Sequence, residues 1–423
     1  MNGRFMISFE KAQEKLHALA LMQKKILEAK EVPLEQAYAH ISYRDIYAHE
    51  YHPSFDNSSM DGFAVRASDL AQASLNAPQS LTVIGESSAG SPFDASLGPG
   101  QTCRIMTGAK IPKGADAVIK VEDVTELGGQ ISVSQAIIPG LNIRQKGEDL
   151  RPGDLLVPKG TPLSPEDILL LSSQGKNKVT INKPIRISII STGQEIRSAG
   201  TSPDPLMGEI RNSTGPFLKA KLKQLPCELI SQESSSDKVD DLFNSISRAI
   251  NLGSDIIIST GGVSAGRYDM IPGMISDLQG RIDFHKVSMK PGKPILVASF
   301  SKTKPCTYFG LPGNPISTMI GCNFFVEPFL KHLTGQTTPS PVKAILKQEI
   351  STSKNLTTFL RANVGVNLEA KLEASLCQGQ GSHMLSSLRG YNAWLKIDKG
   401  IDHLPKGTLV DAFLLSEDSR FIY

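Results

Sequence analysis

The sequence predicts a multidomain protein that combines a largely parallel α/β sheet with β modules. Its 423 residues exceed what one hydrophobic core usually supports, so we expect roughly two to four domains. From Pro184 onward, apolar runs of strand length alternate with helical patterns, which is typical of a parallel sheet flanked by helices. Between about residues 80 and 135, short β-type runs are separated by Gly, Pro and Asp clusters, which indicates a small β-rich module.

The composition is that of an ordinary folded chain. Hydrophobic residues make up 40% and charged residues 21%, and 36 glycines with 26 prolines indicate many turns. The net charge of +3 is too small to argue for nucleic acid or an anionic membrane as a partner. No signal-peptide pattern and no apolar run near the roughly 18 residues of a membrane span is present, so we expect a cytoplasmic protein.

The cysteines argue against two kinds of stabilising site. Five are present, and they are widely scattered and never form a CxxC pair: Cys103, Cys227, Cys306, Cys322 and Cys377. An odd, dispersed set is untypical of a disulfide framework or a zinc–thiolate site. We therefore expect buried or neutral thiols, because free cysteine behaves mainly as a small hydrophobic residue.

Helical periodicity marks three segments in the first half of the chain. Apolar residues recur at helical spacing from Ser8, a suitable N-cap, to about residue 30, which predicts one long amphipathic helix. Pro33 predicts a second, short helix over 34–39, because proline fits the first helical turn. A third helix is expected over 167–173, and packing against the first two would make their domain discontinuous.

Apolar runs define the expected strands and the helices between them. In the β-rich module we expect strands at 81–84, 102–106, 117–121 and 131–133. In the α/β part we expect strands at 186–191, 227–230, 255–259, 295–298 and 307–311. The intervening helices are expected near 214–225, 238–251, 269–278 and 315–333.

Three of these strands end in loops that combine glycine with hydroxyl or amide side chains. The loops are Ser191-Thr192-Gly193-Gln194-Glu195, Thr260-Gly261-Gly262-Val263-Ser264 and Leu311-Pro312-Gly313-Asn314-Pro315. Glycine can take positive φ and lets backbone N–H groups approach an anion closely. Ligands of parallel sheets sit beyond the carboxyl ends of the strands, so we expect a phosphate-type site there.

Charged residues accompany these strand ends. Lys290-Pro291-Gly292-Lys293-Pro294 places two cations on a stiff loop, which is either a solvated face or part of an anion site. Glu195 and Asp269 either cap the following helices or hold a divalent cation between themselves and a bound phosphate. Mg²⁺ prefers a few carboxylates together with phosphate oxygens and water, so the second interpretation implies Mg²⁺.

Polar loops in the first half carry further candidates. Asp56 and Asp61 lie on a turn-rich segment before a strand, Thr107 follows a strand, and Asp149 ends a dense polar loop. Asp and Asn favour turns because they bond their own backbone, so ordinary turns explain these residues as well as ligand binding does.

Taken together and in this order, the motifs resemble the molybdopterin molybdenumtransferases, the family of bacterial MoeA and the C-terminal domain of gephyrin. The matching segments are 56–65, 104–109, 144–149, 191–193, 259–264, 290–294 and 311–315. Any one of them is weak evidence. Seven in the same order along nearly the whole chain are highly specific.

The resemblance implies an elongated homodimer with four domains per subunit. The domains would be a discontinuous helical and linker domain at 1–50 and 145–184, a β-rich module at 51–144, a molybdopterin-binding α/β domain at 185–335 and a C-terminal β-barrel at 336–423. The active site would combine the α/β domain of one subunit with the polar loops of the other.

The resemblance also implies the reaction. Molybdate would be inserted into the dithiolene of adenylated molybdopterin, with release of AMP in the presence of Mg²⁺. Other molybdenum cofactor biosynthesis proteins are further implied partners. The implied catalytic residues are Asp61, Asp149, Glu195 and Asp269, of which Asp61, Glu195 and Asp269 would bind the metal.

The resemblance assigns substrate contacts as well. The implied molybdate-binding residues are Lys290, Lys293, Ser317, Arg361 and Ser382, which suit a dianion because charged donors make strong hydrogen bonds. The remaining implied substrate-binding residues are Thr107, Thr192, Gly193, Gly261, Gly262, Ser264, Pro312, Gly313, Asn314 and Pro315.

Two positions depart from the family pattern. Gln194 stands where the family usually has an acid, and Asn212 begins a segment where the family has Asp-x-Asn. Asp237 is a candidate replacement for one lost carboxylate. Two alternative functions therefore stay open: a molybdopterin adenylyltransferase, which would consume ATP, and a non-catalytic molybdopterin-binding or scaffold protein.

Overall fold

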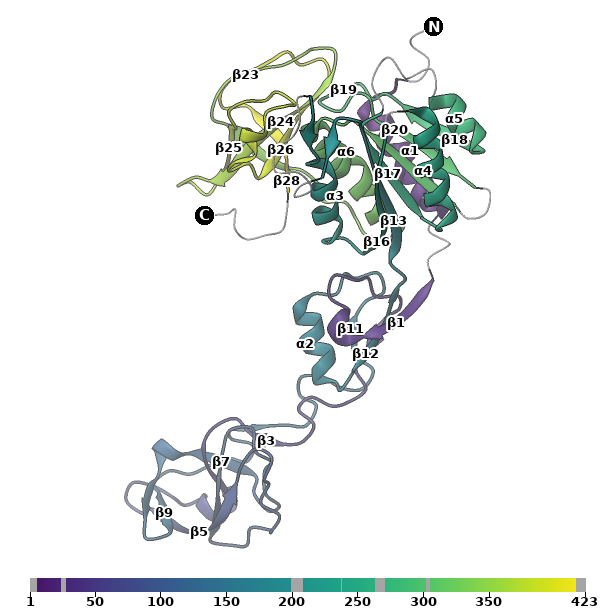
Figure 1. Ribbon diagram of the computed structural model, residues 1–423. Helices are drawn as coiled ribbons and strands as arrows, with labels where there is room; N and C mark the ends of the chain where they lie inside the picture. The colour runs from purple at the N-terminus through teal and green to yellow at the C-terminus, as the bar shows by residue number, and fades with distance from the viewer. Residues whose placement is uncertain are drawn as a thin grey trace. The chain divides into compact units, whose positions relative to one another are not determined.

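The chain forms two compact units, which the computed structural model describes over residues 6–23, 28–198, 208–236, 238–262, 271–301 and 305–415 (Figure 1). The large unit comprises Met1–Tyr43, Gly160–Ser164 and Lys178–Tyr423. The small unit comprises Arg44–Lys159 and Pro165–Asn177. Each unit has hydrophobic clusters of its own.

A six-stranded mixed sheet forms the centre of the large unit, with the strand order β16-β13-β17-β21-β20-β18. The strands are β13 (Ile185–Thr192), β16 (Cys227–Ser235), β17 (Ile256–Thr260), β18 (Gly280–His285), β20 (Leu296–Phe300) and β21 (Cys306–Leu311). The first four in this order are parallel, and β20 runs antiparallel to both of its neighbours. The predicted, largely parallel α/β sheet is thereby confirmed.

Helices cover both faces of this sheet. They are α1 (Phe9–Gln23), α3 (Thr214–Leu222), α4 (Val239–Asn251), α5 (Ile271–Asp277), and α6 (Pro315–Gly321), which continues through a π-helix (Cys322–Val326) into α7 (Glu327–Leu333). Ile256 and Ile258 of β17 join the hydrophobic cluster of α1, α3, α6 and α7, whereas Ile257 joins that of α4 and α5. Because successive strand residues face opposite sides, an unbroken apolar run is what a strand covered on both faces requires.

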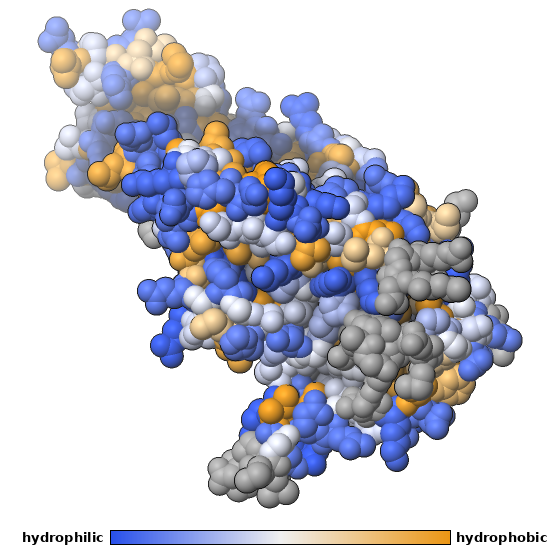
Figure 2. Space-filling model, turned by 90° about the horizontal axis from the view of Figure 1, so that it is seen from above, coloured by the Kyte–Doolittle hydropathy of each residue, from blue (hydrophilic) through white to orange (hydrophobic). Residues whose placement is uncertain are grey.

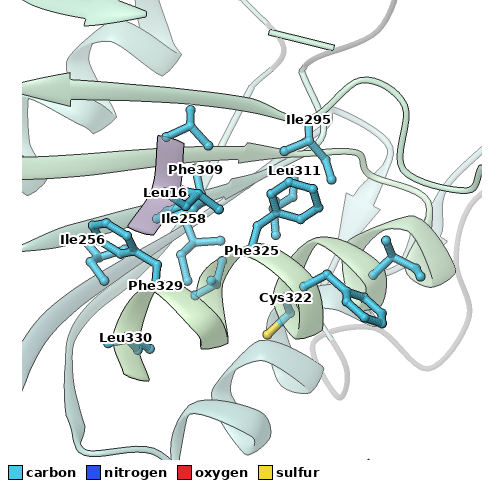
Figure 3. Packing of buried hydrophobic residues seen from close by; sticks show 14 of the residues in the cluster. Leu16, Ile256, Ile258, Ile295, Phe309, Leu311, Cys322, Phe325, Phe329 and Leu330 are labelled. Atoms are coloured by element: carbon cyan, nitrogen blue, oxygen red, sulfur yellow. The ribbon is translucent and has the colours of Figure 1, made fainter. Parts of the chain in front are cut away.

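Aromatic and aliphatic side chains fill the larger of these two clusters (Figure 3). Phe309 of β21 packs against Phe329 of α7, with ring centroids 5.4 Å apart in an edge-to-face arrangement. Leu16 reaches the same cluster from α1, and Phe325 reaches it from the π-helix. The amino-terminal helix is therefore part of the core that supports the central sheet.

A closed five-stranded barrel follows the α/β part, as predicted for the C-terminal region. Its strands pair in the order β24-β25-β22-β28-β26, and β26 pairs again with β24. They are β22 (Val342–Leu346), β24 (Thr357–Val366), β25 (Leu372–Leu376), β26 (Ala393–Ile397) and β28 (Leu409–Leu414). The short strand β19 (Met289–Lys290) adds to β24 in parallel and so joins the lysine loop to the barrel.

The small unit contains the predicted β-rich module. Its six-stranded sheet has the order β7-β4-β6-β5-β9-β8. The strands are β4 (Gly62–Val65), β5 (Gln79–Ser87), β6 (Gln101–Ile105), β7 (Ala117–Lys120), β8 (Thr125–Leu127) and β9 (Gln130–Val133). The same unit contains helix α2 (Pro165–Ser173) and the short pairs of β3 (Asn57–Ser58) with β10 (Ile143–Arg144) and β2 (Ile46–Tyr47) with β11 (Leu155–Val157).

The front of the chain differs from the sequence prediction in two places. Helix α1 is shorter than predicted, and residues Ala29–Pro33 form strand β1, which pairs antiparallel with β12 (Lys178–Asn182). The periodicity misled because only one side chain of β1 is buried, so the strand lacks a clear alternation. A 3₁₀ turn at Leu34–Gln36 follows in place of the helix predicted over 34–39.

Two further short strand pairs and three 3₁₀ turns complete the described structure. The pairs are β14 (Ile196–Arg197) with β15 (Ile210–Arg211), and β23 (Ile350–Ser351) with β27 (His403–Leu404). The remaining 3₁₀ turns are Ala67–Leu70, Val121–Asp123 and Leu385–Leu388. Polar residues cover most of the face seen in Figure 2, with hydrophobic residues scattered among them. Within the described ranges, no helix has the length and hydrophobicity needed to cross a lipid bilayer.

Candidate functional site

The three glycine-containing loops meet at one edge of the central sheet. The strands that precede them, β13, β17 and β21, are adjacent and parallel, so their carboxyl ends lie side by side. The backbone N–H of Gly261 donates to the carbonyl of Leu311 over 3.0 Å, and the Thr192 hydroxyl donates to the carbonyl of Thr260 over 3.1 Å. We call this edge the strand-exit site.

Glycine is required where these loops touch. Gly261 has a φ of +88°, and a Cβ added there would lie 2.5 Å from the carbonyl oxygen of Thr192. Gly262 has a φ of +70°, and its added Cβ would lie 3.0 Å from the Thr192 hydroxyl. Both φ values and both contacts disfavour any larger residue. Backbone therefore packs on backbone, which leaves a flat edge lined by peptide groups and hydroxyls.

Buried polar contacts fix the base of the strand-exit site. The hydroxyls of Thr214 and Thr260 lie 3.1 Å apart. The Asn212 amide donates to the Ser191 hydroxyl over 3.1 Å, and its oxygen accepts the backbone N–H of Gly215 over 2.9 Å. Asn212, one of the two departures from the family pattern, thus uses both ends of its amide to anchor the start of α3, and an aspartate could only accept.

The predicted acids of this edge are only partly described. Glu195 is partly exposed and folds back over the loop, because a Cβ on Gly193 would lie 2.8 Å from its carboxylate. Asp269 and Ser264 lie outside the described residues, as does Asp237. Among the residues that are described, no three His, Cys, Asp or Glu side chains gather into a possible metal site.

A second polar site lies within the large unit, where the α/β part meets the barrel. It is an open pocket of about 830 Å³, which we call the lysine pocket. The α/β part lines it with 289–294 and Ser317, and the barrel part lines it with 349–353, Leu356, 358–360, Leu376 and 380–382. The pocket thus brings together four of the five residues implied for molybdate: Lys290, Lys293, Ser317 and Ser382.

The lysine pocket has an excess of positive charge. Neither Lys290 nor Lys293 forms an ion pair with a described residue, and Glu349 is the one acid in the described lining. The loop between the lysines is rigid, because two prolines bracket the second lysine and Gly292 takes a φ of +96°. Two unpaired cations beside several hydroxyl groups form a suitable site for a small oxyanion.

The strand-exit site and the lysine pocket share one loop. Asn314 lies directly before α6, but its side chain does not cap that helix. Its amide instead donates to the Ser382 hydroxyl in the barrel over 3.2 Å. Ser317, in the first turn of α6, lines the pocket. A ligand of the strand exits and an oxyanion in the pocket would therefore bind to neighbouring parts of one loop and helix.

Arg361, the fifth residue implied for molybdate, does not line the pocket. Its side chain is fully buried on β24, and burial lowers the pKa of its guanidinium. The guanidinium donates to the carbonyls of Gly379 and Gly381 and to the hydroxyl of Ser387, over 2.7, 3.1 and 2.7 Å. Arg361 thus lies behind the loop that carries Ser382.

The predicted residues of the first half lie in the small unit. Asp61 is exposed, and one of its carboxylate oxygens accepts the backbone N–H of Thr107 over 2.6 Å and the Thr107 hydroxyl over 2.7 Å. The backbone bond, and after it the hydroxyl bond, lowers the pKa of Asp61. Asp149 is exposed as well, whereas the Asp56 carboxylate accepts the backbone N–H of Lys146 and so has a structural role.

Sequence reasoning did not identify every residue of the lysine pocket. The side chains of 351–353 and Thr358 line it with hydroxyl groups, and Gln380 shapes its barrel side. These residues belong to short barrel strands and turns that carry no motif of their own. No sequence signal marks them, because the parallel pairing of β19 with β24, which brings Lys290 opposite Thr358, is visible only in the folded structure.

Sequence profiles of known families cover nearly the whole chain. Residues 7–175 match the MoeA N-terminal region, described as domains I and II. Residues 188–332 match a probable molybdopterin binding domain, and residues 343–415 match the MoeA C-terminal region, described as domain IV. The three profiles occur in the order in which the motifs of the sequence analysis occur.

Individual relatives agree with these profiles. The chain is 33% identical to the molybdopterin molybdenumtransferase of Synechococcus elongatus over 96% of this chain and 98% of that one. It is 34% identical to the enzyme of the same name from Haemophilus influenzae, over 89% and 91%. The crystal structure of a molybdopterin biosynthesis MoeA protein from Pyrococcus horikoshii superimposes with a TM-score of 0.76 and 31% identity, covering 97% of this chain and 99% of that one. The chain therefore belongs to the molybdopterin molybdenumtransferase family, as its motifs indicated.

Proposed function

We propose that this protein inserts molybdate into adenylated molybdopterin and releases AMP. The observation that carries the proposal is the arrangement within the large unit, where an oxyanion pocket adjoins a glycine-lined strand-exit site and holds two lysines that form no ion pair with a described residue. Backbone N–H groups at such strand ends suit the phosphates of the adenylated substrate. The lysine pocket suits molybdate, a dianion that needs charged and hydroxyl donors in a rigid frame.

The two sites would bind different parts of the two reactants. The strand-exit loops bind the pyrophosphate, while Lys290, Lys293 and Ser317 hold molybdate beside it. Holding the two reactants in a fixed relative position lowers the entropic cost of bringing them together. The positive charge of the lysines also stabilises negative charge that develops on the oxyanion during transfer.

We propose Mg²⁺ as the cofactor, held by Asp61, Glu195 and Asp269. The chemistry of the described donors fits, because Asp61 is exposed, has a lowered pKa and so offers a permanently charged oxygen ligand at neutral pH. When bound, Mg²⁺ would neutralise charge on the pyrophosphate. Thr107 orients the Asp61 carboxylate through its two hydrogen bonds.

A direct assay tests the reaction. Purified protein is supplied with adenylated molybdopterin, molybdate and Mg²⁺, and AMP release and formation of active cofactor are measured. Asp61→Ala and Glu195→Ala should abolish AMP release without changing the fold, whereas Glu369→Ala, at an exposed acid of a barrel hairpin, should retain it. Tight binding without AMP release in the wild type would favour a non-catalytic scaffold. In a parallel reaction with ATP and molybdopterin that is not adenylated, consumption of ATP would favour an adenylyltransferase. The match to MoeA regions on both sides of the α/β part favours insertion over adenylation.

We further propose the homodimer and the four-domain division that the resemblance implies, with the acids of one subunit completing the strand-exit site of its partner. Mixing two inactive variants tests this arrangement. One variant is Asp61→Ala and the other is the double variant Lys290→Ala, Lys293→Ala. Subunit exchange should restore part of the activity if the residues act across subunits, and no recovery in mixed dimers would contradict it.

A further inference from the structure

Two side chains hold the loop that brings Gln380 and Ser382 to the lysine pocket, and each one binds the backbone of the other's segment. The carboxamide oxygen of Gln380 accepts the backbone N–H of Arg361 over 2.9 Å. Its amide nitrogen donates to the backbone carbonyls of Arg361 and Cys377, both over 2.8 Å. The Gln380 side chain thus satisfies both backbone groups of Arg361 on β24, as a neighbouring strand would.

Arg361 completes the reciprocal arrangement. Its guanidinium donates to the backbone carbonyls of Gly379 and Gly381, the two residues that flank Gln380, and to the Ser387 hydroxyl. Six hydrogen bonds therefore connect Arg361 and Gln380 to each other and to the loop. Charge-assisted bonds of a buried guanidinium are among the stronger ones in proteins. We call Arg361 and Gln380 the clamp.

The two members of the clamp differ in position, because Gln380 lines the pocket and Arg361 lies outside its lining. Arg361 is fully buried. Its guanidinium carbon lies over the Trp394 ring, 5.8 Å from the ring centroid. Its remaining nitrogen, Nη1, is buried without a hydrogen-bond partner among the described residues. A buried cation that forms no hydrogen bond to a described carboxylate is costly to maintain, so its retention needs a benefit elsewhere in the structure.

That benefit is the position of Ser382. The clamped loop presents the Ser382 hydroxyl to Asn314, which precedes α6 and the pocket residue Ser317. The barrel side of the pocket is therefore tied to its α/β side through one hydrogen bond of 3.2 Å. Loosening the loop would release Ser382 and widen the pocket opposite the lysines.

We propose that Gln380 and Arg361 are positioning residues that set the geometry of the oxyanion pocket through the loop that they hold. The inference rests on the proposed function, because it takes the pocket to be the molybdate site. It assigns Gln380 a role that its sequence context does not suggest, and it adds a supporting role to the ligand role that the resemblance implies for Arg361.

Amide hydrogen exchange tests the clamp independently of any ligand. Gln380→Leu removes three hydrogen bonds at nearly constant volume, and Gln378→Leu is the matched control, because Gln378 is an exposed glutamine two residues earlier in the same loop. We expect faster exchange over 377–387 in Gln380→Leu only. Equal exchange in both variants would overturn the clamp.

Molybdate titration by calorimetry, together with the AMP assay, tests what the clamp does. Gln380→Leu should weaken molybdate binding by about tenfold, the equivalent of one to two net hydrogen bonds, and should raise the KM for molybdate but leave that for adenylated molybdopterin unchanged. A purely structural role would change both constants alike and would overturn the proposal. Should Gln380→Leu misfold, Ser387→Ala, which removes one bond to Arg361, should show the same selective effect in weaker form.

If the proposed function is wrong, the binding experiment and the hydrogen-exchange experiment give different answers. If the wild type binds no molybdate, the lysine pocket is not the molybdate site, while the hydrogen-exchange comparison still decides whether Gln380 and Arg361 hold the loop. Arg361→Lys separates support from charge, because lysine keeps the positive charge but lacks the rigid planar fork with which arginine bonds all three acceptors. We expect Arg361→Lys to behave like Gln380→Leu. Molybdate affinity equal to that of the wild type would show that charge alone matters.

Discussion

The two units hold their polar residues in different ways. In the small unit, Asp61 is fixed by two short hydrogen bonds from a single residue, Thr107, at an exposed surface. In the large unit, the lysine pocket is assembled from a loop of the α/β part and a loop of the barrel, joined through Asn314 and Ser382. The first arrangement depends on local contacts, and the second depends on the packing of two folded parts.

The difference follows from what each site requires, because Asp61 is a single charged group and the lysine pocket is a site with a defined shape. A carboxylate that needs to be only ionised and oriented is adequately served by donors on one nearby loop, as Asp61 is by Thr107. A pocket that must match a tetrahedral oxyanion needs donors from several directions, and these require buried supports such as Arg361. The comparison predicts that mutations act separately on the two units.

Core truncations should have the largest effect and test whether the units are energetically separate. Phe63 lies in the core of the small unit and Phe325 in that of the large unit, and both are fully buried. Phe63→Ala and Phe325→Ala should each cost about 3–5 kcal/mol through lost burial and a residual cavity. By differential scanning calorimetry, each should shift only the transition of its own unit. A shift of both transitions by either variant would show one cooperative structure.

Removal of the pocket charges should have the next largest effect. The double variant Lys290→Ala, Lys293→Ala removes both lysines of the pocket and should weaken molybdate binding by about a hundredfold, because two charge-assisted contacts are lost. Asp61→Asn, in the small unit, should leave molybdate affinity unchanged. Titration calorimetry measures both, with the exposed Lys406→Ala as the control for a lost positive charge. Equal losses for Lys406→Ala would mean that the overall charge of the protein governs binding.

Two glycine-to-alanine substitutions test the strand-exit site, and we expect their effects to be smaller than those of the lysine substitutions. Gly261→Ala places a Cβ 2.5 Å from a carbonyl oxygen at a φ of +88°, so it should cost about 1–3 kcal/mol and weaken binding of the adenylated substrate. Gly273→Ala is the control, because an added Cβ in helix α5 would meet nothing within 4 Å. Alanine favours the helix, so Gly273→Ala should be neutral or stabilising by up to about 1 kcal/mol. Denaturant unfolding measures both, and equal effects would contradict the assigned strain.

The smallest expected effect concerns the pKa of Asp61. Thr107→Val removes the hydroxyl bond and keeps the backbone bond, so the pKa should rise toward its ordinary value. A carboxyl group with a lowered pKa in the folded state stabilises the fold above its unfolded pKa, and that stabilisation is lost as pH falls through the folded pKa. In Thr107→Val this loss should be smaller and should be complete at a higher pH, because the folded pKa lies closer to the unfolded one. NMR titration of Asp61 measures the shift, and Thr125→Val, at an exposed strand residue, should leave it unchanged.

Much of the large unit was predictable because its patterns are local. The strands β13, β17 and β21 are apolar runs that end in glycine, and both features follow from burial on two faces and a tight exit. Strand β18 was missed, because it lies at the sheet edge and its sequence mixes charged with apolar residues. Helix α1 was extended too far, because β1 buries only one side chain and so shows no clear alternation that would mark it as a strand.

The site was predictable in its residue types more than in its geometry. The resemblance named four residues that the structure places in one pocket: Lys290, Lys293, Ser317 and Ser382. The buried position of Arg361 depends on the pairing of distant barrel strands, which no local pattern encodes. Asp269 and Ser264 lie outside the described residues, so their assignment stays a prediction.

The most direct measurement is the position of molybdenum in crystals of the wild-type protein soaked with molybdate. Anomalous scattering at the molybdenum absorption edge locates the metal without reference to any assumed chemistry. The account predicts one strong peak among the side chains of Lys290, Lys293, Ser317 and Ser382, with Arg361 still bonded to its loop. A peak elsewhere in the protein, or an Arg361 side chain that has left its loop, would contradict it.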